Sequence, residues 1–187
     1  RSKNKGEAKL MRIISGKYRG MVLAQFNGAE IRPTADRVKE SLFNILSDKT
    51  GGARVLDLFC GSGNLGIECI SRGAEFVGFN DASRDSIAVL KKNLARIPEK
   101  NYSVTVCDYA ACLARGGAFD IILIDPPYRS DAGVRALEII AKNSLLNAGG
   151  VAVYERDVSF CGTVDGLEMY DERKYGKTYL SFFKAVT

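Results

Sequence analysis

The chain has 187 residues, of which 46% are hydrophobic and 26% charged, a composition typical of a globular protein with one sizeable core. It contains no histidine, which excludes Ser-His-Asp and Cys-His catalysis. Its five cysteines include no Cys-x-x-Cys pair, so we expect reduced thiols and no metal site. No apolar run approaches the roughly 20 residues of a membrane helix, and no signal peptide is expected, which favours a cytoplasmic protein.

The first fifty residues differ from the rest and predict an extension to the main domain. Residues 1–10 are polar, basic and without periodicity, and we expect a flexible tail. Residues 11–50 predict a β-hairpin around the turn Gly16–Gly20, and then an amphipathic helix that Thr34 can cap. The positive net charge of +5 is concentrated here, because Glu7 is the only acid before residue 30. This excess is mild evidence for a polyanionic partner.

Residues 51–187 alternate between strand and helix patterns and predict the main domain. Apolar runs bounded by turn residues predict strands at 54–58, 75–80, 103–106, 119–124 and 151–154. Helices are expected between them, and the helix before residue 151 is expected to stop at Gly149-Gly150. Two later segments, 167–173 and 179–183, predict an antiparallel hairpin at the sheet edge.

Strands separated by helices predict the α/β class with a doubly wound, mostly parallel sheet of seven strands, similar to a Rossmann fold. Ligands bind such sheets beyond the carboxyl ends of the strands. We therefore expect functional residues directly after each strand.

A glycine-rich turn, residues 57–66 (DLFCGSGNLG), follows the first parallel strand. Its Gly-x-Gly-x-x-Gly spacing allows a tight bend and a close approach of the backbone to a ligand. Asp57, Asp81 and Asp108 each end one of three successive strands. Three carboxylates around one turn disfavour a pyrophosphate and favour a cationic ligand without phosphate, such as S-adenosylmethionine. Asp57 would accept from its ammonium group, Asp81 from the ribose and Asp108 from the adenine amine.

The sequence Asp125-Pro126-Pro127-Tyr128 follows the most apolar strand and predicts the catalytic element. Two prolines stiffen the backbone and donate no N–H group, so the loop presents the Asp125 carboxylate and carbonyl oxygens as acceptors. Such acceptors suit an exocyclic nucleobase amine, because they position the nitrogen and stabilise its developing positive charge. Tyr128 can stack on the base. A sulfonium methyl donor is already activated, so this chemistry needs no histidine.

These motifs resemble the class I S-adenosylmethionine-dependent methyltransferases that act on exocyclic amines. Three further segments resemble the RsmD family, namely 11–20 (MRIISGKYRG), 32–43 (RPTADRVKESLF) and 175–178 (YGKT). The resemblance extends from residue 11 to about 183. It implies methylation of the N2 amine of one guanine in bacterial 16S ribosomal RNA, presented as RNA or as a small-subunit particle. We expect a monomer without a metal.

The resemblance and the motifs together define the predicted site. The predicted cofactor-binding residues are Asp57, Phe59, Gly61, Ser62, Gly63, Asn64, Asp81, Asp108 and Tyr109. At Asn80-Asp81 the chain departs from the family, which more often has an apolar residue followed by Glu. The candidate contacts to RNA phosphates are Lys17, Arg19, Arg32, Thr34, Arg37 and Lys174. Cys60 is interpreted as a pocket wall rather than a nucleophile.

Three alternatives stay open from the residues alone. The first is an adenine or cytosine N-methyltransferase acting on DNA or another RNA, which shares the Asp-Pro-Pro-Tyr chemistry but which residues 32–43 disfavour. The second is a non-catalytic nucleic-acid-binding protein with the same fold, which the intact glycine turn and Asp125 disfavour. The third is a nucleotide-dependent dehydrogenase, which Asp57 disfavours.

Overall fold

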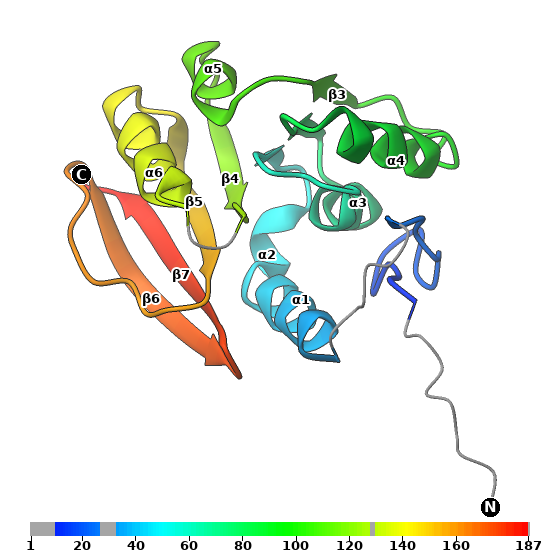
Figure 1. Ribbon diagram of the computed structural model, residues 1–187, viewed down its shortest axis with the longest axis horizontal. Helices are drawn as coiled ribbons and strands as arrows, with labels where there is room; N and C mark the ends of the chain where they lie inside the picture. The colour runs from blue at the N-terminus through cyan, green and yellow to red at the C-terminus, as the bar shows by residue number, and fades with distance from the viewer. Residues whose placement is uncertain (1–9, 27–32, 128–129, 187) are drawn as a thin grey trace, which may run out of the picture.

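The computed structural model describes residues 10–26, 33–127 and 130–186, with the side chains of 33–35 outside this description. Within these residues a seven-stranded sheet has the order β3-β2-β1-β4-β5-β7-β6 (Figure 1). Its strands are β1 (Arg54–Asp57), β2 (Phe76–Asn80), β3 (Tyr102–Thr105), β4 (Phe119–Ile124), β5 (Leu146–Arg156), β6 (Leu167–Tyr175) and β7 (Thr178–Ala185). Strands β1 to β5 are parallel, whereas β7 is antiparallel to both β5 and β6. The predicted fold class and C-terminal hairpin are confirmed.

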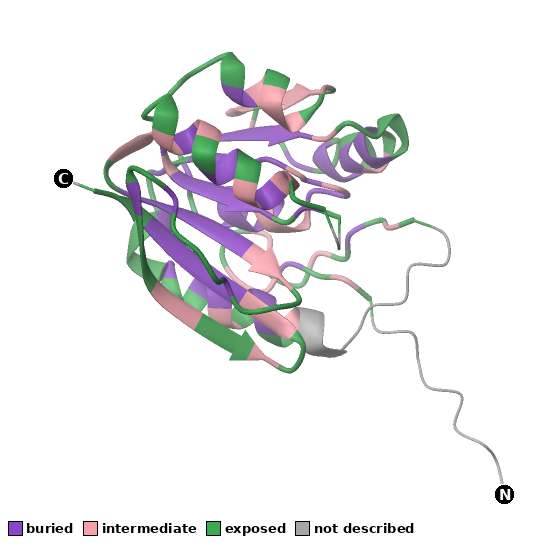
Figure 2. Ribbon diagram, turned by 60° about the vertical axis from the view of Figure 1, so that its left-hand side comes forward, coloured by how far each residue is buried: buried purple, intermediate pink, exposed green. Residues whose placement is uncertain are grey.

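The helices divide between the two faces of the sheet. They are α1 (Pro33–Ile45), α2 (Ser47–Thr50), α3 (Asn64–Ser71), α4 (Arg84–Leu94), α5 (Tyr109–Ala114) and α6 (Ala132–Lys142). One core cluster joins α1, α3, α4 and the N-terminal segment to the sheet, and a second joins α5 and α6 to its other face. Strand β4 contributes alternate residues to both clusters, as expected of a central parallel strand. Figure 2 shows that burial is concentrated in the sheet between these helices. No helix in the described part of the chain combines the length and apolarity needed to cross a membrane.

The predicted helix stop at Gly149-Gly150 was wrong. Helix α6 ends at Lys142, and both glycines lie within β5. The register between β4 and β5 jumps there from Phe119↔Leu146 to Ile121↔Val151. Gly149 has a φ of +74°, a backbone conformation that favours glycine. The glycine pair therefore forms the irregularity in β5 at which the register shifts.

The predicted N-terminal hairpin is present but short. Arg12 and Val22 form one isolated antiparallel bridge, and the Ile13 amide donates to the Met21 carbonyl at 3.0 Å. The capping role expected of Thr34 was wrong, because α1 begins one residue earlier, at Pro33. Proline suits the first helical position, where no N–H donor is needed. Three predictions lie outside the described residues, those for the tail up to residue 9, for Arg32 and for Tyr128.

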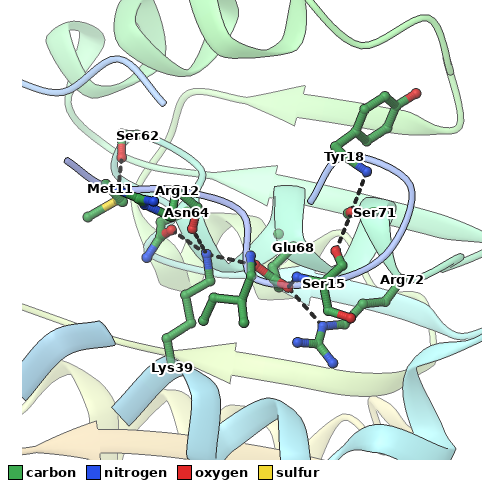
Figure 3. A network of polar contacts seen from close by, with 12 residues as sticks. Met11, Arg12, Ser15, Tyr18, Lys39, Ser62, Asn64, Glu68, Ser71 and Arg72 are labelled. Carbon is green, nitrogen blue, oxygen red and sulfur yellow. Dashed lines mark hydrogen bonds and ion pairs between the residues drawn. The ribbon is translucent and has the colours of Figure 1, made fainter. Parts of the chain in front are cut away.

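A buried carboxylate, Glu68 of α3, joins the N-terminal segment to α1 and α3 (Figure 3). It is 0% exposed, and it accepts from the backbone amides of Ile14 at 2.8 Å and Ser15 at 3.0 Å. Its other partners are the Lys39 ammonium at 2.8 Å and the Arg72 guanidinium at 2.9 Å. Four donors therefore compensate the desolvation of one buried charge.

Lys39 of α1 is the matching cation and is 3% exposed. Besides Glu68, its ammonium donates to the Arg12 carbonyl at 3.0 Å and to Asn64 Oδ1 at 2.7 Å. Burial lowers the pKa of Lys39, and Glu68 opposes that effect. Gly16 completes the junction, because a Cβ there would lie only 1.9 Å from the Ser71 carbonyl oxygen. The N-terminal segment, α1 and α3 are thus held together by contacts that tolerate little change.

Replacing Lys39 by Met should destabilise the protein by about 3 kcal/mol, because Glu68 stays buried without its cation from α1. The measurement is urea unfolding followed by circular dichroism. Lys91→Met, at an exposed position on α4, is the matched control and should change the free energy of unfolding by less than about 0.5 kcal/mol. Equal midpoints for the two variants would contradict this account.

Candidate active site

The glycine turn and the Asp-Pro-Pro segment lie at the carboxyl ends of neighbouring strands, β1 and β4. Two cavities open there. The first, about 330 Å³, is bounded by the glycine turn, α1, residues 11–26 and the ends of β4 and β5. The second, about 540 Å³, is bounded by the ends of β2 and β3 and by the Asp-Pro-Pro segment. Phe59, Gly61 and Asp125 line both cavities, so the two are adjoining parts of one site.

Asp57 forms the floor of the first cavity and holds the glycine turn in place. It is 2% exposed, and its Oδ2 accepts from the Gly66 amide at 2.9 Å. A Cβ on Gly66 would lie 2.3 Å from the ring of Phe79 and 3.0 Å from that same carboxylate oxygen. Gly66 therefore allows α3 to pack closely against the sheet. Burial raises the pKa of Asp57 to about 7, although the Gly66 amide opposes the shift.

The two other glycines of the turn have different roles. The Gly61 amide donates to Asp81 Oδ2 at 2.9 Å, and Gly61 lines both cavities. Gly63 lines neither of these two cavities in the described part of the chain, and a Cβ on it would lie 2.3 Å from Leu90 Cδ1 of α4. Gly63 has a φ of +86°, so the turn and the packing of α4 both require glycine there. Among the other predicted residues, Ser62 and Asn64 line the first cavity.

The second cavity gathers the acceptors predicted for an adenosine group. Asp81 is fixed by the Gly61 amide and by the Ser83 amide, which donates to its Oδ1 at 2.8 Å. Asp108 caps α5, where its Oδ1 accepts from the Ala110 amide at 2.8 Å. The rings of Phe59 and Tyr109 lie beside them, with centroids 5.6 Å apart. The structure thus brings Asp81, Asp108, Phe59 and Tyr109 to one cavity.

The Asp-Pro-Pro segment presents acceptors to both cavities. Asp125 is exposed at the cavities, and desolvation by the surrounding protein raises the pKa of its carboxyl group. Ser130 Oγ donates to the Pro127 carbonyl at 2.9 Å, which holds the segment after the second proline. No donor in the described part of the chain bonds to the Pro126 carbonyl, so this oxygen is available to a ligand. Asp125 and Pro126 are therefore placed as a pair of acceptors.

Glu155 is a site residue that the sequence reasoning missed. It lies near the carboxyl end of β5 and lines the first cavity together with Asp125. Burial raises the pKa of Glu155, and the nearby Asp125 raises it further. A signal was available, because Glu155 directly follows the expected strand 151–154 just as Asp125 follows 119–124. The rule that functional residues follow strands applies to both.

The candidate RNA contacts lie in two groups. Lys17 and Arg19 belong to the turn 16–20, where Lys17 forms an ion pair with Glu99 and Arg19 is exposed. Arg37 is exposed on α1, and Lys174 is exposed on β6 with its ammonium 5.2 Å from the ring centroid of Tyr179. Helix α1 packs against β6, so the last two lie on adjoining elements. Thr34 lies in the first turn of α1.

The cysteines are all free thiols, and one of them borders the site. Cys60 is buried and lines the first cavity, as expected of a pocket wall. Burial raises the pKa of the Cys60 thiol, so it carries little thiolate at neutral pH. The described residues contain no group of three or more histidine, cysteine or acidic side chains placed to hold a metal ion.

The architecture is shared with solved structures of methyltransferases. The Escherichia coli protein yhhF, described provisionally as a methyltransferase, superposes with a TM-score of 0.86 at 31% identity, covering 95% of this chain and 98% of that one. Together with the glycine turn and the strand-end carboxylates, this similarity places the chain in the class of Rossmann-like methyltransferases.

Sequence comparison specifies the family within that class. Residues 11–184 match the model of the family described as Conserved hypothetical protein 95. The Bacillus subtilis protein YlbH is 36% identical over 181 residues, which cover 93% of this chain and 98% of that protein. Ribosomal RNA small subunit methyltransferase D of Haemophilus influenzae is 34% identical over 158 residues, covering 82% and 80%. The chain belongs to this family, the RsmD family.

Replacing Asp57 by Asn should change how stability depends on pH. The ordinary pKa of Asp57, 3.8, rises to about 7 in the fold. The folded protein therefore binds this proton more tightly, and the stability that the protonated group contributes is complete below pH 4 and lost as the pH rises through 7. Asn cannot ionise and still offers an oxygen to Gly66.

As the pH rises from 4 to 8, the unfolding free energy of D57N should therefore increase relative to that of wild type, by up to about 4 kcal/mol. Chemical denaturation at several pH values measures it. Asp85→Asn, exposed on α4, is the matched control, whose difference from wild type should not vary in this way. A D57N difference that is constant with pH would refute the assigned burial effect.

Proposed function

We propose that this protein transfers a methyl group from S-adenosylmethionine to the exocyclic N2 amine of a guanine in bacterial 16S ribosomal RNA. The observation that carries the proposal is that Asp125 lines both cavities, so an amine held by the Asp-Pro-Pro segment lies next to the glycine turn. Relatives named ribosomal RNA small subunit methyltransferase D support ribosomal RNA as the substrate class.

The donor set of the second cavity fits S-adenosylmethionine. Asp81 offers carboxylate oxygens for ribose hydroxyls, Asp108 offers an acceptor for the adenine amine, and Phe59 and Tyr109 offer aromatic surface for the adenine ring. Asp57, in the adjoining cavity, offers a carboxylate to the ammonium group, whose charge would favour ionisation of this buried acid. When bound, S-adenosylmethionine supplies a methyl group activated by a sulfonium sulfur.

The acceptors at the end of β4 act on the amine. The Asp125 carboxylate and the Pro126 carbonyl each accept one N–H of the nitrogen, which fixes its position and favours its pyramidal, nucleophilic form. As the nitrogen forms its bond to the methyl carbon, the bond from that carbon to sulfur breaks and its electron pair stays on sulfur. The nitrogen becomes positively charged, and the negative Asp125 stabilises that charge. The methylated nitrogen then loses one proton, and a carboxylate with a raised pKa is suited to accept it.

Helix α1 supports this substrate assignment over an adenine or cytosine methyltransferase. Its residues Val38, Lys39 and Leu42 belong to the segment 32–43 that resembles the RsmD family, and they line the first cavity together with Asp125. The family-specific segment thus borders the place where the base would enter. The proposal includes a ribosomal RNA or small-subunit particle as partner, a monomeric protein, a cytoplasmic location and no requirement for a metal ion.

Replacing Asp125 by Ala should lower methyl transfer at least about 100-fold while the affinity for S-adenosylmethionine changes less than about threefold, because Asp125 bonds to the amine. Labelled methyl transfer to small-subunit particles and to free ribosomal RNA, followed by nucleoside analysis for N2-methylguanosine, measures the first quantity. Calorimetry measures the second. Asp131→Ala, exposed before α6, is the matched control. Near-normal turnover of D125A would refute the role of Asp125, and another methylated nucleoside would refute the guanine assignment.

Replacing Arg32 and Arg37 by Ala should weaken RNA binding and reduce its salt dependence. Each phosphate that a side chain neutralises adds roughly 0.7 to 0.9 to the steepness of log affinity against log salt concentration, so removing two such side chains makes the slope shallower. Filter binding between 50 and 300 mM salt tests this expectation. Arg135→Ala, exposed on α6 and paired with Asp131, serves as the control and should keep the wild-type slope. Unchanged slopes in the double variant would exclude direct phosphate contacts from these two residues.

A further inference from the structure

The pairing of β4 with β5 places two carboxyl groups side by side. Ile124 of β4 pairs with Tyr154 of β5 in a parallel register, so the next residues in each chain, Asp125 and Glu155, are neighbours at the sheet edge. Adjacent parallel strands lie about 4.8 Å apart, and residues at equal register point to the same face. Leu123 one position earlier packs on the α1 side of the sheet, whereas Ile124 packs on the α6 side. Side chains two positions apart along a strand point to the same face of the sheet. Asp125 comes two positions after Leu123, and Glu155 two positions after Val153, so both lie on the α1 side.

Both carboxyl groups face one cavity and have no donor in the described part of the protein. They line the first cavity with Val38 and Leu42 of α1. No hydrogen bond or ion pair joins either carboxyl group to another described residue. Their environment disfavours two negative charges, since burial raises the pKa of both groups and Asp125 raises that of Glu155 further. A ligand that brings two adjacent N–H donors would satisfy both acceptors at once.

Among the nucleobases with an exocyclic amine, guanine alone has a ring N–H beside that amine. Its N1–H lies next to the N2 amine on the same edge, whereas adenine and cytosine have a ring nitrogen acceptor beside theirs. Resting on the proposed function, we propose that Glu155 is a specificity-determining residue that accepts a hydrogen bond from N1–H of the target guanine while Asp125 holds the N2 amine. A base with an acceptor at that place leaves the Glu155 carboxylate opposite a lone pair, without a donor, which is unfavourable.

The test replaces the target guanine, once mapped, by 2-aminopurine in an otherwise identical RNA. This base keeps the 2-amine, but its N1 is an acceptor and carries no hydrogen. Wild type should prefer guanine by about 100-fold or more in kcat/KM. Glu155→Ala should lower kcat/KM for guanine at least about 30-fold and change that for 2-aminopurine less than about threefold, so that the preference collapses. 2-Aminopurine also lacks O6, but that difference is the same for every enzyme variant and cancels in the comparison.

Two further variants separate this role from a structural one. Glu155→Gln keeps an oxygen that can accept from N1–H and should retain part of the preference that Glu155→Ala loses. Glu138→Ala, exposed on α6, is the matched control and should leave both rates unchanged. Calorimetry with S-adenosylmethionine should give the wild-type affinity for all three variants, which shows that the fold and the cofactor site are intact.

The outcomes distinguish this inference from the function on which it rests. If wild type methylates no guanine, the proposed function fails and the role of Glu155 fails with it. If wild type methylates guanine and E155A keeps the full preference over 2-aminopurine, the proposed function stands and the role of Glu155 is refuted. A wild-type preference for 2-aminopurine would also refute it, because Glu155 would then be donating a proton to N1.

Discussion

The buried ion pair between Lys39 and Glu68 is the interaction on which the site depends. Glu68 accepts hydrogen bonds from two backbone amides of the N-terminal segment. Lys39 of α1 donates a hydrogen bond to Asn64, the first residue of α3. Because the two charges are almost completely removed from water, separating them leaves an uncompensated charge in the core. The ion pair therefore fixes the α1 wall of the first cavity relative to the glycine turn that borders both cavities.

The second constraint is the close placement of carboxyl groups at the carboxyl ends of three adjacent strands. Asp57, Asp125 and Glu155 come from β1, β4 and β5 and line the same cavity. Burial raises the pKa of each, and neighbouring carboxylates raise those of Asp57 and Glu155 further. Such an arrangement costs folding stability and is expected where a ligand provides the missing donors and positive charge. A sulfonium donor with an ammonium group and an aromatic amine together supply both.

Two carboxylates that line the second cavity also stabilise the local fold. Asp81 accepts from the amides of Gly61 and Ser83, and Asp108 caps the short helix α5. These bonds satisfy backbone donors at the turns, and they also fix the orientation of each carboxylate. Each carboxylate has further lone pairs free for a ligand. The local turn chemistry thus prepares the acceptors before any ligand arrives.

The sequence by itself determined the α/β class, the position of β4, the glycine turn and the strand-end carboxylates Asp57, Asp81, Asp108 and Asp125. These features follow from local periodicity and turn chemistry, which a stretch of ten residues already contains. Only the tertiary structure decided that Gly149-Gly150 lies within a strand, that Lys39 pairs with Glu68, and that Glu155 lies beside Asp125. The reason is physical, because the partners are about thirty residues apart or more, and burial and register arise only when distant segments pack together.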